Sequence, residues 1–251
     1  MTDPGAEPEP PADAGLAWAD AALAASGLVR IAPAELVQER AWGRVRRVAT
    51  DGGPCWLKEP APALRHEARL TVALGRVAPD LLPAIVAADP ATGRLLLRDA
   101  GRRLRELAAE ERSLERWLEV LPRYAELQLA VAPDVERLLA LGLPDLRPEQ
   151  LPTRYAALLD ELEALDDAWP ATPAERRRFR VAVPFVEAGA AALATSGIPA
   201  SVDHGDLHDG QVHFAAVGPG LPAGRSPRLL DWGDASVAHP FASMAVTLVG
   251  C

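Results

Sequence analysis

Two acidic segments in the second half of the chain have the residue types and spacing for catalysis. They are residues 204–211 (HGDLHDGQ) and residues 229–234 (LLDWGD). Each places a carboxylate, Asp206 or Asp231, close to a short apolar run where a strand is expected to give way to a loop. Phosphoryl transfer needs such a pair, because one carboxylate orients the acceptor hydroxyl and the other holds the magnesium that bridges the nucleotide phosphates.

A single lysine is the second informative feature of the sequence. The chain has 26 Lys and Arg residues, and only Lys58, in the apolar run 55–58 (CWLK), is a lysine. Lysine carries a compact point charge, whereas arginine presents a wide planar fork. A site that keeps lysine in such a chain suits a narrow anionic partner, for example the α- and β-phosphates of ATP. Alternatively, Lys58 is a lysine that remains at a strand edge by chance and has no role in binding. The two acidic segments make this alternative the weaker one.

Together, these segments and Lys58 resemble the aminoglycoside phosphotransferase and choline kinase-like family, the small-molecule branch of the protein-kinase-like fold. The resemblance covers roughly residues 36–241. It implies a two-lobed α+β fold, with an antiparallel five-stranded sheet plus a helix in the N-terminal lobe and a mainly helical C-terminal lobe. It also implies that ATP and Mg²⁺ bind. Members usually continue with further helices, so this chain would be a compact or a truncated member.

The resemblance also implies roles for individual residues. Asp206 would accept or orient the proton of the acceptor hydroxyl, with a loop-capping Asp as the plainer alternative. Asp231 would be the main magnesium ligand, and Gln211 stands where the family usually has Asn. Gln is longer by one carbon–carbon bond, about 1.5 Å, so it would need a backbone shift or a bridging water, or it would weaken a second metal site. Glu67 would pair with Lys58, unless it is a solvated helix residue.

Two further segments are assigned to the nucleotide by position. Trp42 and Gly43 stand where a Gly-rich phosphate loop would be, although residues 41–44 (AWGR) hold one glycine and also fit a tight β-turn. The hinge whose backbone would meet adenine is represented by Leu97, Asp99 and Ala100. Backbone contacts leave no side-chain signature, so this second assignment rests on position alone.

The elements that must position these residues follow from periodicity and from turn residues. We expect strands at 35–40, 45–49, 55–58, 85–88, 95–97, 201–203, 212–215 and 228–231, with Lys58 at the end of the third. We expect helices at 16–25, 64–76, 104–130, 147–168 and 173–196, and a further helix within 241–249. The resulting division is a disordered tail at 1–14, a nucleotide-binding lobe at 15–100 and a helical catalytic lobe at 101–251.

Composition narrows the class of partner. The net charge of −9 disfavours nucleic acid and anionic membranes as partners. No signal peptide or membrane-spanning stretch is visible, so the cytoplasm is the expected location. Cys55 and Cys251 are the only cysteines, and we expect no disulfide between them. The expected partner is a small molecule with a hydroxyl group; the sequence sets no expectation for its identity, for ATP over GTP or for the oligomeric state.

Two other functions remain open at this stage. A nucleotide-binding module or pseudokinase without transferase activity is favoured by Gln211 and by the poor glycine loop. A metal-dependent hydrolase could be built on residues whose types can ligate zinc, namely His204, Asp206, His208 and His213. The hydrolase leaves Lys58 and Asp231 unexplained, so it ranks last. We otherwise expect these histidines, and Asp234, to be packing or loop residues.

Overall fold

The structure, a computed structural model, describes residues 13–165, 170–216 and 223–249. The chain forms two compact units: the first holds residues up to Val120 and Gly210–Gly233, and the second holds Leu121–Asp209 and the chain from Asp234 onward. The expected division at residues 100 and 101 follows the change from strands to helices, and it stays a prediction. Most of the expected tail, up to residue 12, lies outside the described residues.

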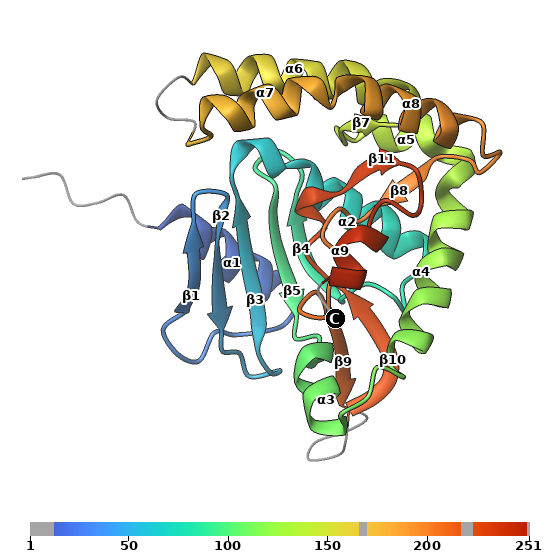
Figure 1. Cartoon of the computed structure of the whole chain (residues 1–251). Helices are drawn as coiled ribbons and strands as arrows, with labels where there is room; N and C mark the ends of the chain where they lie inside the picture. Colours follow the sequence, from blue (N-terminus) through green and yellow to red (C-terminus); the bar gives the residue numbers. More distant parts are fainter. Residues whose placement is uncertain (1–12, 166–169, 217–222, 250–251) are drawn as a thin grey trace, which may run out of the picture. The chain divides into compact units, whose positions relative to one another are not determined.

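A five-stranded antiparallel sheet forms the centre of the first unit (Figure 1). Its strands are β1 (Glu35–Arg40), β2 (Gly43–Val48), β3 (Cys55–Pro60), β4 (Ile85–Asp89) and β5 (Arg94–Arg98), in the order β1-β2-β3-β5-β4. The expected sheet is thus confirmed. Lys58 differs from expectation because β3 continues for two residues beyond it, so it lies inside the strand, opposite Val45 and Leu95.

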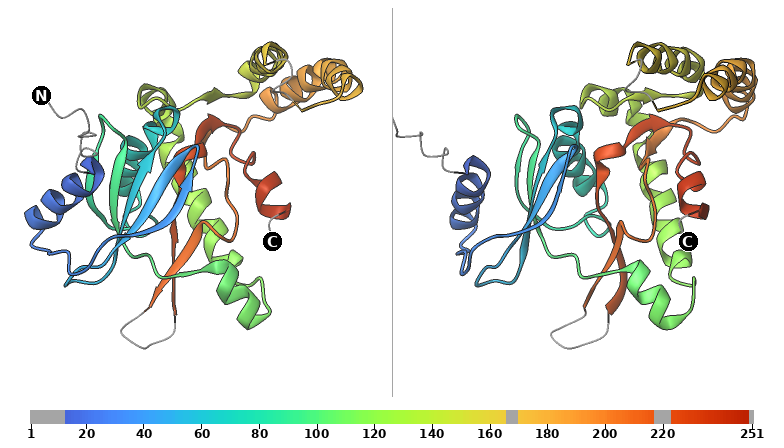
Figure 2. Two further views of the ribbon diagram at one scale, coloured as in Figure 1. Left: turned by 90° about the vertical axis from the view of Figure 1, so that its left-hand side faces the viewer. Right: turned by 60° about the vertical axis from the view of Figure 1, so that its left-hand side comes forward.

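One helix covers each face of this sheet (Figure 2). Helix α1 (Ala14–Ala25) packs with Leu57 and Leu96, whereas α2 (His66–Val77), preceded by the 3-10 turn Pro62–Leu64, packs with Leu95 and Leu97. The faces separate because successive strand residues point to opposite sides. Burying each such leucine contributes roughly 1.5–3 kcal/mol. Asp13 caps the first turn of α1, so the helix begins two residues before the expected start.

A second, smaller sheet belongs to the same unit. It consists of β6 (Arg102–Arg103), β9 (Val212–Ala216) and β10 (Ala223–Leu229), in the order β10-β9-β6, and α3 (Leu104–Glu111) follows β6. The turn from β5 into β6 requires Gly101, which has φ +90° and would place a Cβ only 2.3 Å from the Phe214 carbonyl oxygen. This turn joins the expected hinge to the sheet that ends near Asp231.

The second unit is mainly helical. Helix α4 (Trp117–Val131) begins in the first unit and continues into the second, which also holds α5 (Val135–Ala140), α6 (Leu151–Ala164), α7 (Pro173–Val181), α8 (Val183–Ala194) and α9 (Met244–Val249). A three-stranded sheet accompanies them: β7 (Asp145–Leu146), β11 (Ser236–Ala238) and β8 (Ser201–Asp203), in that order. Strand β11 runs antiparallel to β8 and parallel to β7. Short 3-10 turns lie at Ala132–Asp134, Pro148–Gln150 and, across the unit boundary, Trp232–Asp234.

The three long helices expected between residues 104 and 196 are wrong in detail. The first is broken into α3 and α4, because Arg112 takes a left-handed conformation with φ 50° and ends α3. The last is broken into α7 and α8 just before Pro184, whose ring cannot continue a helix. The middle one starts only at Leu151, and its expected end at 166–168 lies outside the described residues. Within the described part of the chain, no helix is both long and apolar enough to cross a membrane.

Candidate functional site

Lys58 lies between two carboxylates in the first unit. Its Nζ donates to Glu67 Oε1 at 2.7 Å and also to Asp231 Oδ1. The ion pair expected between Lys58 and Glu67 is therefore present. Glu67 comes from the first turn of α2 and is buried, and its Oε1 also accepts the Trp232 backbone N–H at 3.1 Å. Strand β3, helix α2 and the segment after β10 thus converge on one ammonium group.

The surroundings keep this ammonium charged. Burial alone would lower the pKa of Lys58, but the negative charges of Glu67 and Asp231 outweigh burial and raise the pKa above its ordinary value. Burial raises the pKa of the Glu67 carboxyl, although Lys58 opposes that rise. The Lys58 side chain retains 19% of its exposure and that of Asp231 retains 45%. A cation that is positioned by a buried partner and still accessible is suited to binding an anion.

The sequence predicted that Asp231 ends a strand. In the structure, Asp231 lies two residues beyond the end of β10. Its φ of 63° is left-handed, a conformation that Asp tolerates better than most residues. Gln211 Nε2 donates to Asp231 Oδ2 at 3.2 Å, and the Leu230 backbone N–H donates to the Gln211 carbonyl oxygen at 2.9 Å. The strand-end hydrogen bond therefore brings together the two residues expected to bind metal.

These two side chains fit a hard divalent cation. Carboxylate and amide oxygens are the ligands that Mg²⁺ takes from proteins, usually through one or two carboxylates while waters and phosphates fill the other positions. Asp231 and Gln211 are the residues here that would hold such an ion. Among the described residues, no group of three or more His, Cys, Asp or Glu side chains is placed to hold a metal. This donor set suits a magnesium ion shared with phosphate oxygens better than an all-protein metal cage.

The residues expected at the nucleotide lie on, or directly beside, β2 and β5, the two strands paired with β3. Gly43 pairs with Pro60, and a Cβ at Gly43 would lie 2.9 Å from the Glu59 carbonyl oxygen, so the two strands approach closely there. Trp42 belongs to the two-residue turn between β1 and β2 and is exposed. The structure therefore shows a tight hairpin turn at this position instead of an extended glycine-rich loop.

The expected hinge follows β5. Leu97 is a buried residue of that strand and pairs with Trp56 of β3, and Ala100 is also buried. Asp99 Oδ1 accepts the Trp56 indole N–H at 2.8 Å, while the Asp99 backbone N–H donates to the Pro54 carbonyl oxygen at 3.2 Å. The Asp99 side chain thus ties the hinge to the start of β3.

Asp206 lies in the second unit, in the loop that follows β8. Its carboxylate Oδ2 lies 3.4 Å from His208 Nε2, and its carbonyl oxygen accepts the His208 backbone N–H at 3.0 Å. The turn needs Gly205, whose φ is 78° and whose Cβ would lie 2.2 Å from the Asp234 carbonyl oxygen. The sequence thus located the loop between two strands correctly. Its catalytic role stays a prediction.

The histidines have partners that suit packing roles. His213, on β9 in the first unit, has its Nδ1 3.0 Å from the Gly101 carbonyl oxygen, and burial lowers its pKa. His204 and His208 belong to the loop of the second unit, where the His204 backbone N–H donates to the Tyr124 hydroxyl at 2.9 Å. The zinc site considered from the sequence needed these side chains to converge, and no such cluster occurs in the part of the chain that the structure describes.

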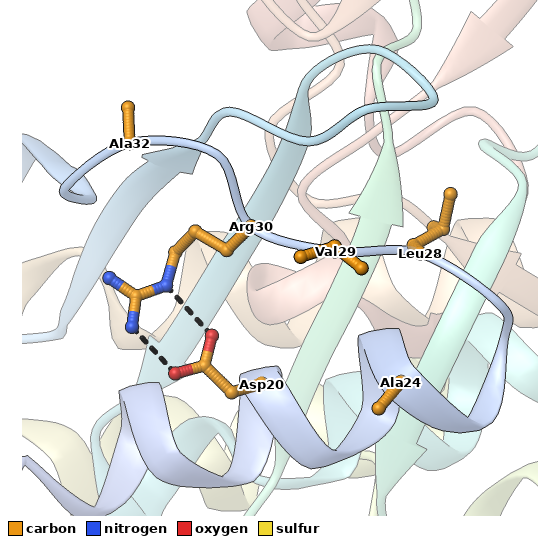
Figure 3. Close-up of a pocket in the computed structure, with 6 residues that line it drawn as sticks. All are labelled: Asp20, Ala24, Leu28, Val29, Arg30 and Ala32. Atoms are coloured by element: carbon orange, nitrogen blue, oxygen red, sulfur yellow. Dashed lines mark hydrogen bonds and ion pairs between the residues drawn. The ribbon is translucent and has the colours of Figure 1, made fainter.

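A cavity of about 440 Å³ lies elsewhere in the first unit (Figure 3). It is lined by α1 and by the segment leading to β1, through Asp20, Ala24, Leu28, Val29, Arg30 and Ala32. The guanidinium of Arg30 faces the Asp20 carboxylate through two hydrogen bonds of 2.7 and 2.6 Å. None of the candidate residues lines this cavity.

Sequence reasoning missed the residues that support the Asp206 loop. Asp203, Tyr124 and Ser243 are buried and are joined by hydrogen bonds around the start of the loop. An Asp inside the short strand 201–203 (SVD) was the available signal, because a buried carboxylate needs several donors. Ser243, its partner, lies in the segment before α9, and Tyr124, which contacts Ser243, lies on α4; no local pattern connects either with Asp203.

Comparison with known proteins bears on the fold. No protein-family model and no curated protein sequence matches the chain. Among solved structures, the GDP complex of aminoglycoside 2′-phosphotransferase-IIIa is similar, with a TM-score of 0.58 and 17% identity over 95% of this chain and 79% of that one. A choline/ethanolamine kinase family protein from Mesorhizobium loti has a TM-score of 0.55 and 18% identity over 94% and 70%. Macrolide 2′-phosphotransferase type I has a TM-score of 0.54 and 16% identity over 95% and 77%. The chain therefore has the protein-kinase-like fold that these phosphotransferases and kinases share.

Proposed function

We propose that the protein is an ATP-dependent phosphotransferase that moves the γ-phosphate to a hydroxyl group of a small molecule. The observation that carries the proposal is the position of Lys58, whose ammonium is bonded to both Glu67 and Asp231. A cation, a buried acid that orients it and an exposed acid at a loop are the parts that nucleotide phosphates and their metal require. The similar structures named above are also phosphotransferases or kinases for small molecules.

Each residue has a separate task in the proposed reaction. Lys58 donates to phosphate oxygens, and Glu67 keeps its ammonium in place. Asp231, with Gln211 beside it, holds Mg²⁺, which when bound neutralises charge on the phosphates. Asp206 accepts a hydrogen bond from the acceptor hydroxyl and takes its proton as the oxygen attacks the γ-phosphate. Trp42, Gly43 and the backbone of the hinge would contact the rest of the nucleotide.

The acceptor is proposed only as a class. An aminoglycoside, another amino sugar or a different small alcohol would each supply the hydroxyl group, and the acidic chain, with net charge −9, suits a cationic acceptor. Use of ATP fits the cytoplasmic location expected from the sequence. A thermal-shift screen with ATP and GTP, each with and without Mg²⁺, followed by these acceptors, would identify both substrates.

A nucleotide-binding module without transferase activity is the second candidate. Two observations favour it: the Gln211 side chain donates to Asp231, the proposed metal ligand, and the Trp42 turn is shorter than a glycine-rich loop. Such a protein would bind MgATP through Lys58 and Asp231 without transferring phosphate to any acceptor of the panel.

The decisive experiment compares the wild type with Asp206→Asn. We expect the variant to bind MgATP with unchanged affinity in calorimetry, because Asp206 is not assigned to the nucleotide. Transfer of labelled phosphate should fall by about 10²–10⁴-fold, the usual contribution of a positioned acid–base group. Equal transfer by both proteins would remove Asp206 from the reaction. MgATP binding without phosphorylation of any acceptor by the wild type would select the nucleotide-binding module.

A further inference from the structure

A buried carboxylate, that of Asp203, forms hydrogen bonds at the start of the loop that carries Asp206. Asp203 is the last residue of β8, and its Oδ1 accepts both the backbone N–H of Ser243, at 2.8 Å, and the Ser243 hydroxyl. Its Oδ2 accepts the Gly205 backbone N–H at 3.1 Å. Ser243 Oγ also lies 3.3 Å from the Gly205 nitrogen. Asp203 and Ser243 therefore converge on the residue immediately before Asp206.

This carboxylate is unusual in its surroundings. Asp203 is 4% exposed and Ser243 is 1% exposed. Within the described residues, Asp203 forms no ion pair, so backbone N–H and hydroxyl donors alone stabilise its charge. Burial raises the pKa of Asp203, and the three hydrogen bonds oppose that rise. Burying a carboxylate without enough hydrogen-bond donors lowers the stability of the folded protein. The presence of a buried carboxylate at the start of a loop therefore needs an explanation.

The neighbouring contacts concern the same short stretch of backbone. Tyr124 of α4 accepts the His204 backbone N–H at 2.9 Å, and its hydroxyl lies 3.4 Å from Ser243 Oγ. On the far side of Asp206, Thr247 of α9 donates to the Leu207 carbonyl oxygen at 2.6 Å. The backbone is thus anchored on both sides of Asp206, while the Asp206 side chain retains 37% of its exposure.

We propose that Asp203 and Ser243 are positioning residues that fix the backbone before Asp206 and thereby aim its carboxylate at the acceptor hydroxyl. The inference rests on the proposed function of Asp206 and adds a specific support to it. The position of the carboxylate matters in such reactions, because a displacement of about 1 Å at a reacting group can lower the rate by about 10²-fold. Asp203 needs both oxygens for this task, since one holds Ser243 and the other holds Gly205.

The chain provides a matched control for this proposal. Ser201 lies in the same strand as Asp203, is 1% exposed like Ser243, and donates its hydroxyl to the Gln128 carbonyl oxygen at 2.6 Å. It therefore makes a buried hydroxyl-to-backbone bond from the same strand to α4 without holding the loop. Ser201→Ala removes the hydroxyl bond to Gln128, whereas Ser243→Ala removes the hydroxyl contacts with Asp203, Gly205 and Tyr124. Only the Ser243 substitution should alter the aim of Asp206.

The experiment measures steady-state release of phosphate from MgATP, with water or an acceptor found in the screen. We expect Ser243→Ala and Asp203→Asn to lower kcat by about 10–100-fold while the KM for MgATP stays within about twofold. Ser243→Thr, which keeps the hydroxyl, should recover most of the rate. Ser201→Ala should keep kcat within about threefold although it also loses a buried hydrogen bond and some melting temperature. Equal kcat losses in Ser243→Ala and Ser201→Ala would show that the Asp203–Ser243 pair serves stability alone and would overturn the proposal.

Hydrogen exchange separates this inference from the proposed function. In Asp203→Asn the side-chain amide would face the Gly205 N–H as a second donor, so exchange of the 204–206 amides should accelerate by at least about tenfold relative to Ser201→Ala. Unchanged exchange at these amides would overturn the positioning role even in an active enzyme. If the wild type transfers no phosphate but the amides respond as expected, the proposed function fails while the anchoring of the loop stands.

Discussion

At the scale of single residues, the proposed binding of nucleotide phosphates depends most on Lys58. We expect Lys58→Ala to abolish measurable MgATP binding in calorimetry, because it removes the ammonium that would donate to the phosphates. Lys58→Arg should also weaken binding, because the planar fork is wider than the group it replaces. Both variants should keep the fold, as judged by circular dichroism.

Arg47 offers a matched control for this comparison. It lies on β2, beside the strand of Lys58, but its side chain is exposed. Arg47→Ala removes one positive charge from the same sheet and should leave MgATP affinity unchanged. If Arg47→Ala weakens binding as much as Lys58→Ala does, general electrostatics explains the effect and Lys58 loses its special role.

Asp231 is open to a similar test with magnesium. Asparagine tolerates the left-handed backbone of Asp231, so Asp231→Asn removes the charge with little change in conformation. We expect magnesium titrations of ATP binding to shift to at least about tenfold higher concentration, because Mg²⁺ prefers an anionic oxygen. Asp234→Asn, three positions later, is the control. A titration that is identical in Asp231→Asn and the wild type would disprove the metal assignment.

Part of this site could be predicted, because the resemblance to a known family implied the pairing of Lys58 with Glu67. The pairing of Lys58 with Glu67 spans nine residues, from a strand to the first turn of the next helix. The bond between Lys58 and Asp231 spans 173 residues, and no periodic pattern reports it. The bonds of Asp203 to Ser243 are hidden for the same reason. The sequence therefore supplied the candidate residues and one of their pairings, whereas the long-range bonds of Lys58 to Asp231 and of Asp203 to Ser243 came from the structure alone.

At the scale of elements, the conformation of Gly205 in the Asp206 loop allows a specific prediction. Gly205 has φ 78°, and a Cβ there would lie 2.2 Å from the Asp234 carbonyl oxygen; Gly197 has φ 74° with no neighbour within 4 Å of that position. Gly197→Ala should thus cost only the conformational strain, about 1 kcal/mol of unfolding free energy. Gly205→Ala should cost clearly more, because the loop and the Asp234 backbone must also separate.

Urea unfolding of both glycine variants measures this difference, and transfer assays show its effect on the reaction. We expect Gly205→Ala to lose most transfer activity while Gly197→Ala keeps it. Equal unfolding free energies in the two variants would mean that the contact with Asp234 is not important for the loop.

The boundaries of helices show where sequence reasoning stops at this scale. Strands of five or six residues were predicted well, because each is a short segment bounded by turn residues. The break at Arg112 was missed because neither Gly nor Pro marks it, and the cost of its left-handed conformation is offset elsewhere. Strands β6, β7 and β11 have two or three residues, which is too short for any period to appear.

At the scale of the whole molecule, ligand binding should be visible as stability. A ligand that binds only the folded protein at 100 times its Kd raises the unfolding free energy by about 2.7 kcal/mol. We expect MgATP to raise the melting temperature of the wild type and to slow amide exchange in β3 and α2. Removing magnesium with EDTA should reverse most of the shift. Protection confined to Leu121–Asp209 would place the nucleotide away from Lys58.

Because the chain has a single lysine, chemical labelling of that side chain can report on the proposed nucleotide site. Apart from the terminal α-amine, Lys58 carries the only aliphatic amine in the sequence, and its two carboxylate partners raise its pKa. An acylating reagent attacks only the neutral amine, so this position should resist labelling at neutral pH and react faster as the pH rises. We expect substitution of Glu67 or Asp231 to speed this labelling, and bound nucleotide to slow it at a raised pH at which the free protein reacts. One labelled peptide, read by mass spectrometry, would thus report the occupancy of the site without any knowledge of the acceptor.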